Sequence, residues 1–377
     1  MRTILPGIDG ASPRRRGPRR SPGRHRSRPG RCRRALPLLA LLALAGCGSA
    51  QGPAAQRGGR TRPLVLTSVA PVTLLTRAVA GDCAEVRPLL PPGAGPHGYE
   101  SSPQDLLALR RARVLVINGL GLESFLDPLR RAAANRSLRV IDSSRGVPVL
   151  AGLDDHGHDH GPQGAPDPGP QGRHDPDLRR GHDDGPKGAR AHAPQAGHAH
   201  GGEGGPNPHI WLDPQRAERQ VITIRDGLIG ADPACAPTYR RQAAATVAQL
   251  RRLDGEIAAL LRPYRGRTFV VFHDFAPYFA ERYGLRAEHL VASPELAASP
   301  ADLRRVSEAV RRSGIRVLLR PPGESSPVLE NLARDLGIQV ASFSPMETLT
   351  AAELADPDSY VRIQRGNAEA LQRAFSP

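Results

Sequence analysis

Short apolar runs alternate with longer amphipathic segments in two stretches of the chain. In the first stretch, apolar runs predict strands at 64–67, 84–90, 114–117 and 138–141. In the second, they predict strands at 268–272, 287–291, 315–319 and 338–342. Buried strands that alternate with helices are typical of parallel sheets. The pattern therefore predicts an α/β protein with two (βα) lobes, each built on a parallel sheet.

Between the predicted strands, helical periodicity and capping residues predict helices. In the first lobe, helices are expected at 71–80, from 102, from a cap at Ser124 to 134, and at 214–229. In the second lobe, they are expected at 276–283, 300–312, 326–336 and 357–375. The predicted organisation is a first lobe at 63–235, a connecting helix at 236–264 and a second lobe at 265–377.

The longest periodic segment runs over 238–261. It carries apolar residues at spacings of three and four along one face, namely Val247, Leu250, Leu253, Ile257 and Leu260. This spacing predicts one amphipathic helix. Its position between the two α/β stretches predicts a rigid connector between the lobes.

Residues 151–206 interrupt the first lobe with a segment rich in Gly, Pro, Asp and His. It has too few large apolar side chains to offset the entropy of ordering, so we predict a disordered insertion. Neutral imidazole suits zinc, copper and nickel, so a short His-rich tract indicates weak auxiliary metal capture. The candidate auxiliary ligands are His156, His158, His160, His198 and His200. The alternative is a polar insertion whose histidines only accompany its low complexity.

The N-terminal region holds most of the excess positive charge. Residues 1–46 contain twelve arginines and one acidic residue, so they carry +11 of the net charge of +15 over 377 residues. No basic stripe interleaved with aromatic residues follows, which argues against nucleic-acid binding by the folded part. The basic segment precedes an apolar run at 35–45, which is too short to span a bilayer and suits an export signal.

Cys47 follows this apolar run after Gly46. The ending Leu44-Ala45-Gly46-Cys47 resembles a bacterial lipobox. The resemblance implies a signal peptide at 1–46 and a lipid on the Cys47 thiol. The residues that follow are small, polar and arginine-bearing, which predicts a flexible tether at 47–62. The alternative is an ordinary signal peptide with a chance cysteine.

Cys83 and Cys235 remain after the signal, in a compartment that permits disulfides. The sequence leaves open whether they form a disulfide or stay as two free thiols.

Three histidines lie where predicted strands or the insertion give way to loops: His97, His209 and His273. Ligands of open α/β sheets bind at the carboxyl ends of the strands. Three imidazoles with an open fourth position suit Zn²⁺. Taken singly, each has another interpretation: a turn-capping residue for His97, a structural histidine beside Trp211 for His209, and a helix cap or general base for His273.

Several motifs together resemble the solute-binding lipoproteins of bacterial ABC transporters for zinc and manganese. The matching segments are 90–93 (LPPG), 96–100 (PHGYE), 118–123 (NGLGLE), 207–214 (NPHIWLDP) and 272–275 (FHDF). The resemblance implies two lobes joined by a long rigid helix, with metal bound in the cleft between them. It places His97, His209 and His273 on three ligand positions. A histidine at the third position is similar to the zinc members, since Mn²⁺ favours oxygen ligands.

Two positions depart from the family's pattern. Ser344 occupies the place where the family often has an aspartate or water as fourth ligand, so we expect water, hydroxide or a histidine of the insertion there. Arg320 stands where the family tends to have glutamate. If Arg320 faces the cleft it lowers the affinity for a cation, and if it faces solvent it has little effect.

The resemblance implies an exported, periplasmic or cell-surface protein without enzymatic activity. It would capture Zn²⁺, remain at the membrane through Cys47, and deliver the ion to an ABC permease. The alternatives are a manganese or iron receptor of the same family and a metal-binding adhesin or storage lipoprotein. A zinc hydrolase with Glu100 or Asp274 as general base is disfavoured, because the chain has no His-Glu-x-x-His pair.

Overall fold

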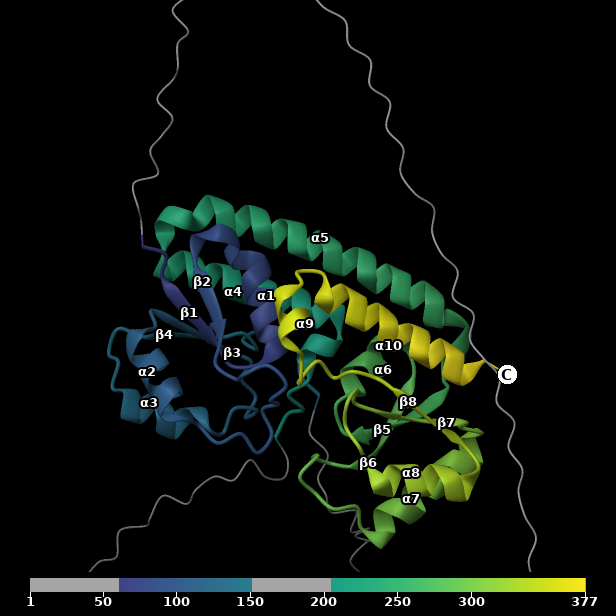
Figure 1. Ribbon diagram of the computed structural model, residues 1–377. Helices are drawn as coiled ribbons and strands as arrows, with labels where there is room; N and C mark the ends of the chain where they lie inside the picture. Colours follow the sequence, from purple (N-terminus) through teal and green to yellow (C-terminus); the bar gives the residue numbers. More distant parts are fainter. Residues whose placement is uncertain (1–60, 151–204, 377) are drawn as a thin grey trace, which may run out of the picture. The chain divides into compact units, whose positions relative to one another are not determined.

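The computed structural model describes residues 61–150 and 205–376, which form two four-stranded sheets with helices around them (Figure 1). The first sheet consists of β1 (Leu64–Thr67), β2 (Glu85–Pro88), β3 (Val114–Ile117) and β4 (Arg139–Asp142). The second consists of β5 (Thr268–His273), β6 (Arg286–Val291), β7 (Val317–Arg320) and β8 (Gln339–Ser342). The predicted signal peptide, Cys47 and the auxiliary histidines lie outside the described residues.

The two sheets have the same topology. Their strand orders are β2-β1-β3-β4 and β6-β5-β7-β8, and all neighbouring strands are parallel. In each sheet the two central strands bury apolar side chains, as their uninterrupted apolar sequences require. The predicted α/β class with two lobes is confirmed. In both lobes the strand order reverses between the two central strands, where open α/β sheets bind their ligands.

The helices of the first lobe are α1 (Ala70–Ala80), α2 (Pro103–Arg111), α3 (Leu126–Ala133) and α4 (Pro214–Ala231). Those of the second are α6 (Pro277–Tyr283), α7 (Pro300–Ser313), α8 (Pro327–Leu336), α9 (Ala351–Ala355) and α10 (Ser359–Phe375). Ser102 and Ser299 cap α2 and α7 with capping boxes, each followed by a proline. The predicted cap at Ser124 is wrong, because Phe125 is the N-cap residue of α3. Helix α9 was not predicted.

Helix α5 (Ala236–Leu261) is the long connector (Figure 1). Its 26 residues give a length of about 39 Å at 1.5 Å per residue. It packs against α1 and α4 of the first lobe and against α6 and α10 of the second. The buried face includes Leu250, Leu253 and Ile257, as the periodicity predicts. One continuous hydrophobic cluster includes residues of both lobes and of α5, so the connector belongs to a shared core.

Cys83 and Cys235 form a disulfide, with their Cα atoms 6.1 Å apart. Cys83 ends a short 3₁₀ helix after α1, and Cys235 ends another directly before α5. The bond therefore fixes the start of the connector to the first lobe.

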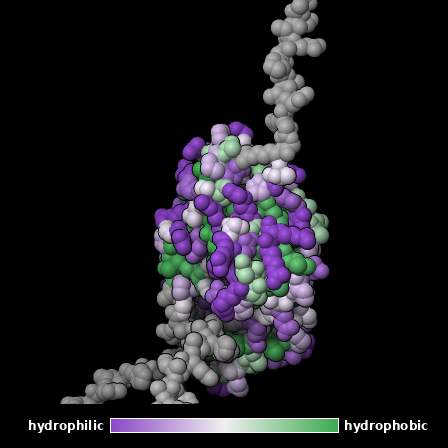
Figure 2. Space-filling view, turned by 90° about the vertical axis from the view of Figure 1, so that its left-hand side faces the viewer, coloured by the Kyte–Doolittle hydropathy of each residue, from purple (hydrophilic) through white to green (hydrophobic). Residues whose placement is uncertain are grey.

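The surface of the described residues gives no indication of a membrane-spanning segment. Among them, no helix combines the length and the apolar character that crossing a membrane requires. On the face shown in Figure 2, hydrophilic residues predominate and hydrophobic residues appear in small separate groups. Scattered apolar residues of this kind are ordinary on protein surfaces.

Candidate metal centre

His97 lies in the loop that follows β2. Its Nε2 is 3.0 Å from Oε1 of Glu347, and its Nδ1 is 3.4 Å from Oε1 of Glu295. The side chain is 23% exposed, which makes it the most accessible of the histidines described below. The first lobe thus contributes one partly exposed imidazole from the end of a strand.

His209 lies at the start of the segment that follows the insertion. Pro208 precedes it, and a 3₁₀ helix (Ile210–Leu212) follows before α4 begins. The His209 ring is buried, and its Nε2 is 3.1 Å from Oε1 of Glu347. Trp211, also buried, packs beside it with ring centroids 5.2 Å apart.

His273 is the last residue of β5 and is 1% exposed. Its Nε2 lies 3.3 Å from Oε2 of Glu347. Neither ring nitrogen makes a hydrogen bond of acceptable geometry within the described residues. A buried imidazole without hydrogen bonds loses its solvation without replacement, unless another ligand engages it. This orphaned ring fits a bound cation.

Glu347 is the fourth member of the group, and the sequence reasoning missed it. It lies in the loop between β8 and α9 and is 4% exposed. The preceding Met346 has φ of 62°, a left-handed conformation that is strained for a bulky residue. Ser344 accepts a hydrogen bond from the backbone N–H of Met346 at 3.1 Å and so stabilises this turn. The Ser344 hydroxyl thus contacts the turn, and Glu347 is the acidic side chain that lies beside the three histidines.

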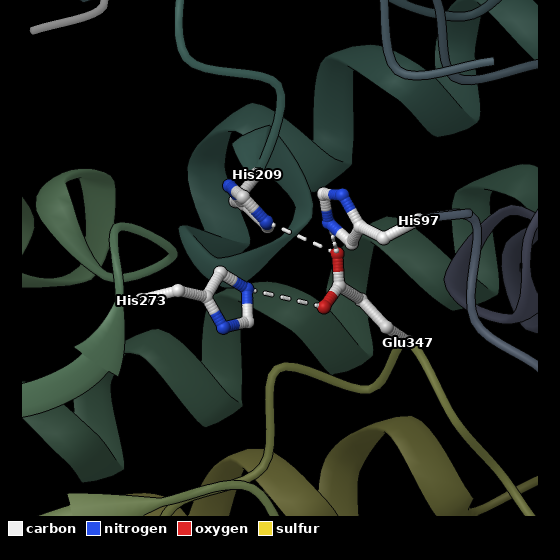
Figure 3. Close-up of side chains that lie close together, drawn as sticks. All are labelled: His97, His209, His273 and Glu347. Carbon is white, nitrogen blue, oxygen red and sulfur yellow. Dashed lines mark hydrogen bonds and ion pairs between the residues drawn. The ribbon is translucent and has the colours of Figure 1, made fainter. Parts of the chain in front are cut away.

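The four side chains converge on one point (Figure 3). One potential ligand atom from each of them can be chosen so that all four lie within 4.8 Å of one another. Tetrahedral zinc with Zn–N distances of about 2.0–2.1 Å needs ligand atoms roughly 3.3 Å apart. Small side-chain movements would reach this geometry. Three imidazoles and one carboxylate form a common kind of zinc donor set.

The charges of the group reinforce one another. Burial opposes ionisation of Glu347, but His209, His273 and His97 outweigh it and hold its pKa well below the usual range. Burial lowers the pKa of His97, yet the hydrogen bond and charge of Glu347 leave this pKa raised overall. Burial holds the pKa of His209 below its usual value despite Glu347. A buried carboxylate beside a neutral imidazole is prepared for a cation.

A cavity of about 240 Å³ adjoins the group on the side of His97. Its lining residues are Gly95, His97, Pro294, Glu295, Glu324, Glu347 and Thr348. Three carboxyl groups thus face one cavity, and burial together with the charge of Glu347 raises the pKa of Glu324. Such a cavity attracts cations.

Arg320, the second departure noted above, is half-buried and donates a hydrogen bond to the backbone carbonyl of Glu324. Its charge stabilises the ionised form of Glu324. The guanidinium therefore binds the loop beside the cavity rather than the four-residue group.

Two lobes of parallel α/β structure, joined by one long helix and with nitrogen and oxygen donors at their strand ends, define the class of two-lobed solute-binding proteins. Sequence comparison gives the family. The family described as zinc-uptake complex component A, periplasmic, matches residues 65–374, and this chain belongs to it.

Curated relatives carry zinc-binding names. Zinc-binding protein AdcA of Streptococcus pyogenes serotype M3 is 26% identical over 312 residues, covering 82% of this chain and 55% of AdcA. High-affinity zinc uptake system protein ZnuA of Yersinia pestis is 27% identical over 300 residues, covering 79% and 86%. The chain spans about half the length of the AdcA relatives that it matches.

Solved structures share the fold. A crystal structure of ZnuA superposes with a TM-score of 0.64 and 24% identity, covering 84% of this chain and all of that one. The Zn(II)-bound ZnuA-like domain of AdcA from Streptococcus pneumoniae gives 0.61 and 23%, with the same coverage. These likenesses confirm the two-lobed fold.

Proposed function

We propose that this protein captures Zn²⁺ outside the cytoplasmic membrane through His97, His209, His273 and Glu347, and delivers it to an ABC permease. The observation that carries the proposal is the convergence of three imidazoles on one buried carboxylate. The orphaned ring of His273 supports it, since a cation would satisfy a nitrogen that no hydrogen bond does. The family and the zinc-binding names of the relatives agree with it.

Zinc is favoured over manganese by the donor set. Three nitrogen donors suit the softer Zn²⁺, whereas Mn²⁺ prefers oxygen ligands. The single carboxylate supplies one negative charge, so a loaded site keeps a net charge of about +1. We infer that the ion is cargo and that the protein performs no chemistry on it. Neither proposed hydrolytic base belongs to the group: Glu100 is exposed, and Asp274 accepts hydrogen bonds from Asn207.

Export and anchoring complete the proposal. A lipid on Cys47 would hold the protein at the membrane beside its permease, and the name of one relative, the zinc-binding lipoprotein AdcA of Streptococcus pneumoniae, supports this. The shared core along α5 argues that release follows from modest movements of the lobes rather than wide opening. The insertion histidines would capture zinc weakly before transfer.

The test is calorimetric titration of residues 48–377 with zinc, with manganese as competitor, and of a variant lacking 151–206. We expect one tight zinc site that survives the deletion and is lost in His97→Ala, His209→Ala and His273→Ala. Asp335→Ala is the control, because Asp335 is exposed on α8, lies outside the group and should leave the affinity within a few-fold of wild type. Loss of the tight site with the insertion alone would overturn the proposal.

A further inference from the structure

The side chain of Asn207 is fully engaged by its neighbours. Its Oδ1 accepts a hydrogen bond from the backbone N–H of His209 at 3.1 Å and lies 3.0 Å from the ring Nδ1 of the same residue. Its Nδ2 donates to the backbone carbonyl and to the carboxylate of Asp274, at 2.8 and 2.9 Å. Asn207 is 5% exposed, so water does not compete for these groups.

The hydrogen-bond partners determine how the Asn207 amide is oriented and which nitrogen of His209 carries a proton. The two Asp274 oxygens accept hydrogen bonds, so the amide NH₂ of Asn207 must face them. Its oxygen then faces His209, where it can only accept. His209 must therefore carry a proton on Nδ1, which leaves Nε2 as the nitrogen with a lone pair. Because Nε2 points at Oε1 of Glu347 from 3.1 Å, a cation or a proton is needed between them.

We propose that Asn207 is a positioning residue that selects the metal-binding tautomer of His209, and that Asp274 holds Asn207 in the orientation this requires. The inference rests on the proposed zinc-binding function. Metal-bound histidines generally donate their second ring N–H to a carboxylate or carbonyl oxygen, which orients the ring and raises its basicity. Here the amide oxygen of Asn207 accepts from the ring of His209. The Asp274 carboxylate accepts in turn from the amide group of Asn207 and so acts on His209 indirectly.

The contacts from Asp274 through Asn207 to His209 form a relay that joins the second lobe to the first. Asn207 and His209 lead into α4 of the first lobe, whereas Asp274 follows β5 of the second. The other carboxylate oxygen of Asp274 lies 3.7 Å from Nδ1 of His289 on β6, which steadies it from its own lobe. Movement of the second lobe away from Asn207 would free the amide to rotate. His209 would then lose its fixed tautomer, which gives lobe movement a route to zinc release.

The backbone of Asn207 is held by the same lobe. Tyr278 of α6 donates its hydroxyl proton to the Asn207 carbonyl at 2.7 Å and accepts from the N–H of Leu150 at 3.1 Å. The N–H of Asn207 in turn donates to the carbonyl of Leu150 at 3.1 Å. This backbone anchoring does not depend on the Asn207 side chain. Substitution of the side chain therefore tests the relay while the segment keeps its place.

The experiment compares Asn207→Ala, Asp274→Ala and the double variant with wild type. We expect Asn207→Ala to weaken zinc binding by about 10- to 100-fold, the range typical of such partners. Asp274→Ala should weaken it less, because the Asp274 carbonyl still accepts from Asn207. Since the two residues act in series, the double variant should bind no more weakly than Asn207→Ala. Asn331→Ala, on an exposed helix face, is the control and should match wild type.

A second measurement distinguishes a role of Asn207 in selecting the His209 tautomer from a purely structural role. In ¹⁵N-histidine spectra of the metal-free protein, we expect the Nδ1–H tautomer for His209 in wild type and a mixture of tautomers in Asn207→Ala. An unchanged tautomer, or affinity within twofold of wild type, would overturn the inference. If Asn207→Ala does not fold, the same two readouts on Asp274→Ala decide it. Absence of tight zinc binding by wild type would instead reject the proposed function.

Discussion

The indole N–H of Trp211 donates a hydrogen bond to the backbone carbonyl of Pro345 at 2.7 Å. Trp211 follows His209 by two residues, and Pro345 precedes Glu347 by two. The bond therefore joins two chain segments, far apart in sequence, that each present one side chain to the candidate centre. Tyr360 and Gln364 of α10 donate hydrogen bonds to the carbonyl of Trp211 and fix it from the other side.

Trp211 is the only tryptophan of the chain, so it should report zinc directly. Its ring lies 5.2 Å from that of His209, between centroids. We expect zinc to change the emission of the metal-free protein in a saturable way, with a midpoint that matches calorimetry. A titration without any spectral change, together with tight binding by calorimetry, would place the metal elsewhere.

Replacing Trp211 with phenylalanine should destabilise the protein by about 1–3 kcal/mol, because the buried Pro345 carbonyl loses its donor. Zinc affinity should fall as well, since Glu347 would be less firmly placed. Chemical unfolding of the metal-free variant and calorimetry measure the two effects. Tyr264→Phe removes a half-buried hydroxyl contact with Ser376 and serves as the control. A variant as stable as wild type would show that the bond does not hold the two segments.

Glu347→Gln and Ser344→Ala distinguish the two candidates for the fourth position. Glutamine removes the negative charge near the cation, which should cost at least about 4 kcal/mol, the interaction of two unit charges 4 Å apart at an effective dielectric constant near 20. That corresponds to roughly a 1000-fold loss of affinity. Ser344→Ala should bind zinc within a few-fold of wild type, because its hydroxyl only stabilises the turn. Calorimetry at constant pH measures both. The reverse order of effects would restore Ser344 as the fourth ligand.

The three histidines could be predicted as a group because each lies at a boundary that the sequence shows. His273 ends an apolar run, His97 follows one, and His209 stands where the periodic pattern resumes after the insertion. Open α/β sheets bind ligands at the carboxyl ends of their strands, and His97 and His273 follow such ends in two different sheets. Which nitrogen of each ring faces the centre depends on partners such as Asn207 and Glu295, and the sequence alone does not show them.

Glu347 could not be predicted with the same reasoning, because its position depends on tertiary contacts. The loop at 343–350 follows a strand, and an acidic residue in it was the available signal. Its path is fixed by the Trp211 bond to Pro345, by Asn367, which accepts from the N–H of Ser344, and by the left-handed Met346. Hydrophobic periodicity in the sequence does not reveal contacts of this kind. Ser344 was predicted from the resemblance, whereas the acidic side chain that lies beside the three histidines is Glu347, three residues further along the chain.

The disulfide between Cys83 and Cys235 should contribute substantially to stability. The two residues are 152 positions apart, and closing so long a loop restricts the unfolded chain. We expect Cys83→Ser with Cys235→Ser to lower the free energy of unfolding by about 3–5 kcal/mol. Zinc affinity should stay within a few-fold, since none of the four candidate ligands lies in the elements that the bond joins.

Urea unfolding of the metal-free protein with and without reductant, compared with the double serine variant, measures this contribution. Reductant should destabilise wild type and leave the variant unchanged. Equal stability of wild type and variant would mean that the bond adds nothing. Loss of zinc binding in a folded variant would show instead that the bond positions the centre.

Glu123 gives the protein a pH-dependent stability that is separate from the metal. Its carboxyl group accepts hydrogen bonds from the Ser68 hydroxyl and from the backbone N–H groups of Asn118 and Gly119, at 2.5, 2.6 and 3.1 Å. Asn118 also donates from its side chain to the carbonyl of Pro208, directly before His209. Burial outweighs the three donors and raises the pKa of Glu123 to about 7.

Because the pKa is higher in the folded state, the folded protein binds this proton more tightly than the unfolded chain. The stabilisation is complete below the ordinary pKa of about 4.3. It decreases as the pH rises and is lost above about 7. Over this window the free energy of unfolding should fall by up to about 4 kcal/mol. The glutamine of Glu123→Gln does not titrate, so the free energy of unfolding of this variant should lack the decrease due to Glu123. All other titrating groups are common to both proteins.

The measurement is urea unfolding of metal-free wild type and Glu123→Gln between pH 5 and pH 8. We expect wild type to lose stability relative to the variant as the pH rises. Parallel curves would mean that Glu123 titrates at its ordinary value. A relative gain by wild type would mean that the three donors outweigh burial, so that the loop at 118–123 encloses a permanent carboxylate. The sign of the change in relative stability with pH thus decides whether burial or hydrogen bonding dominates at Glu123, in the loop that contacts the carbonyl of Pro208 next to His209.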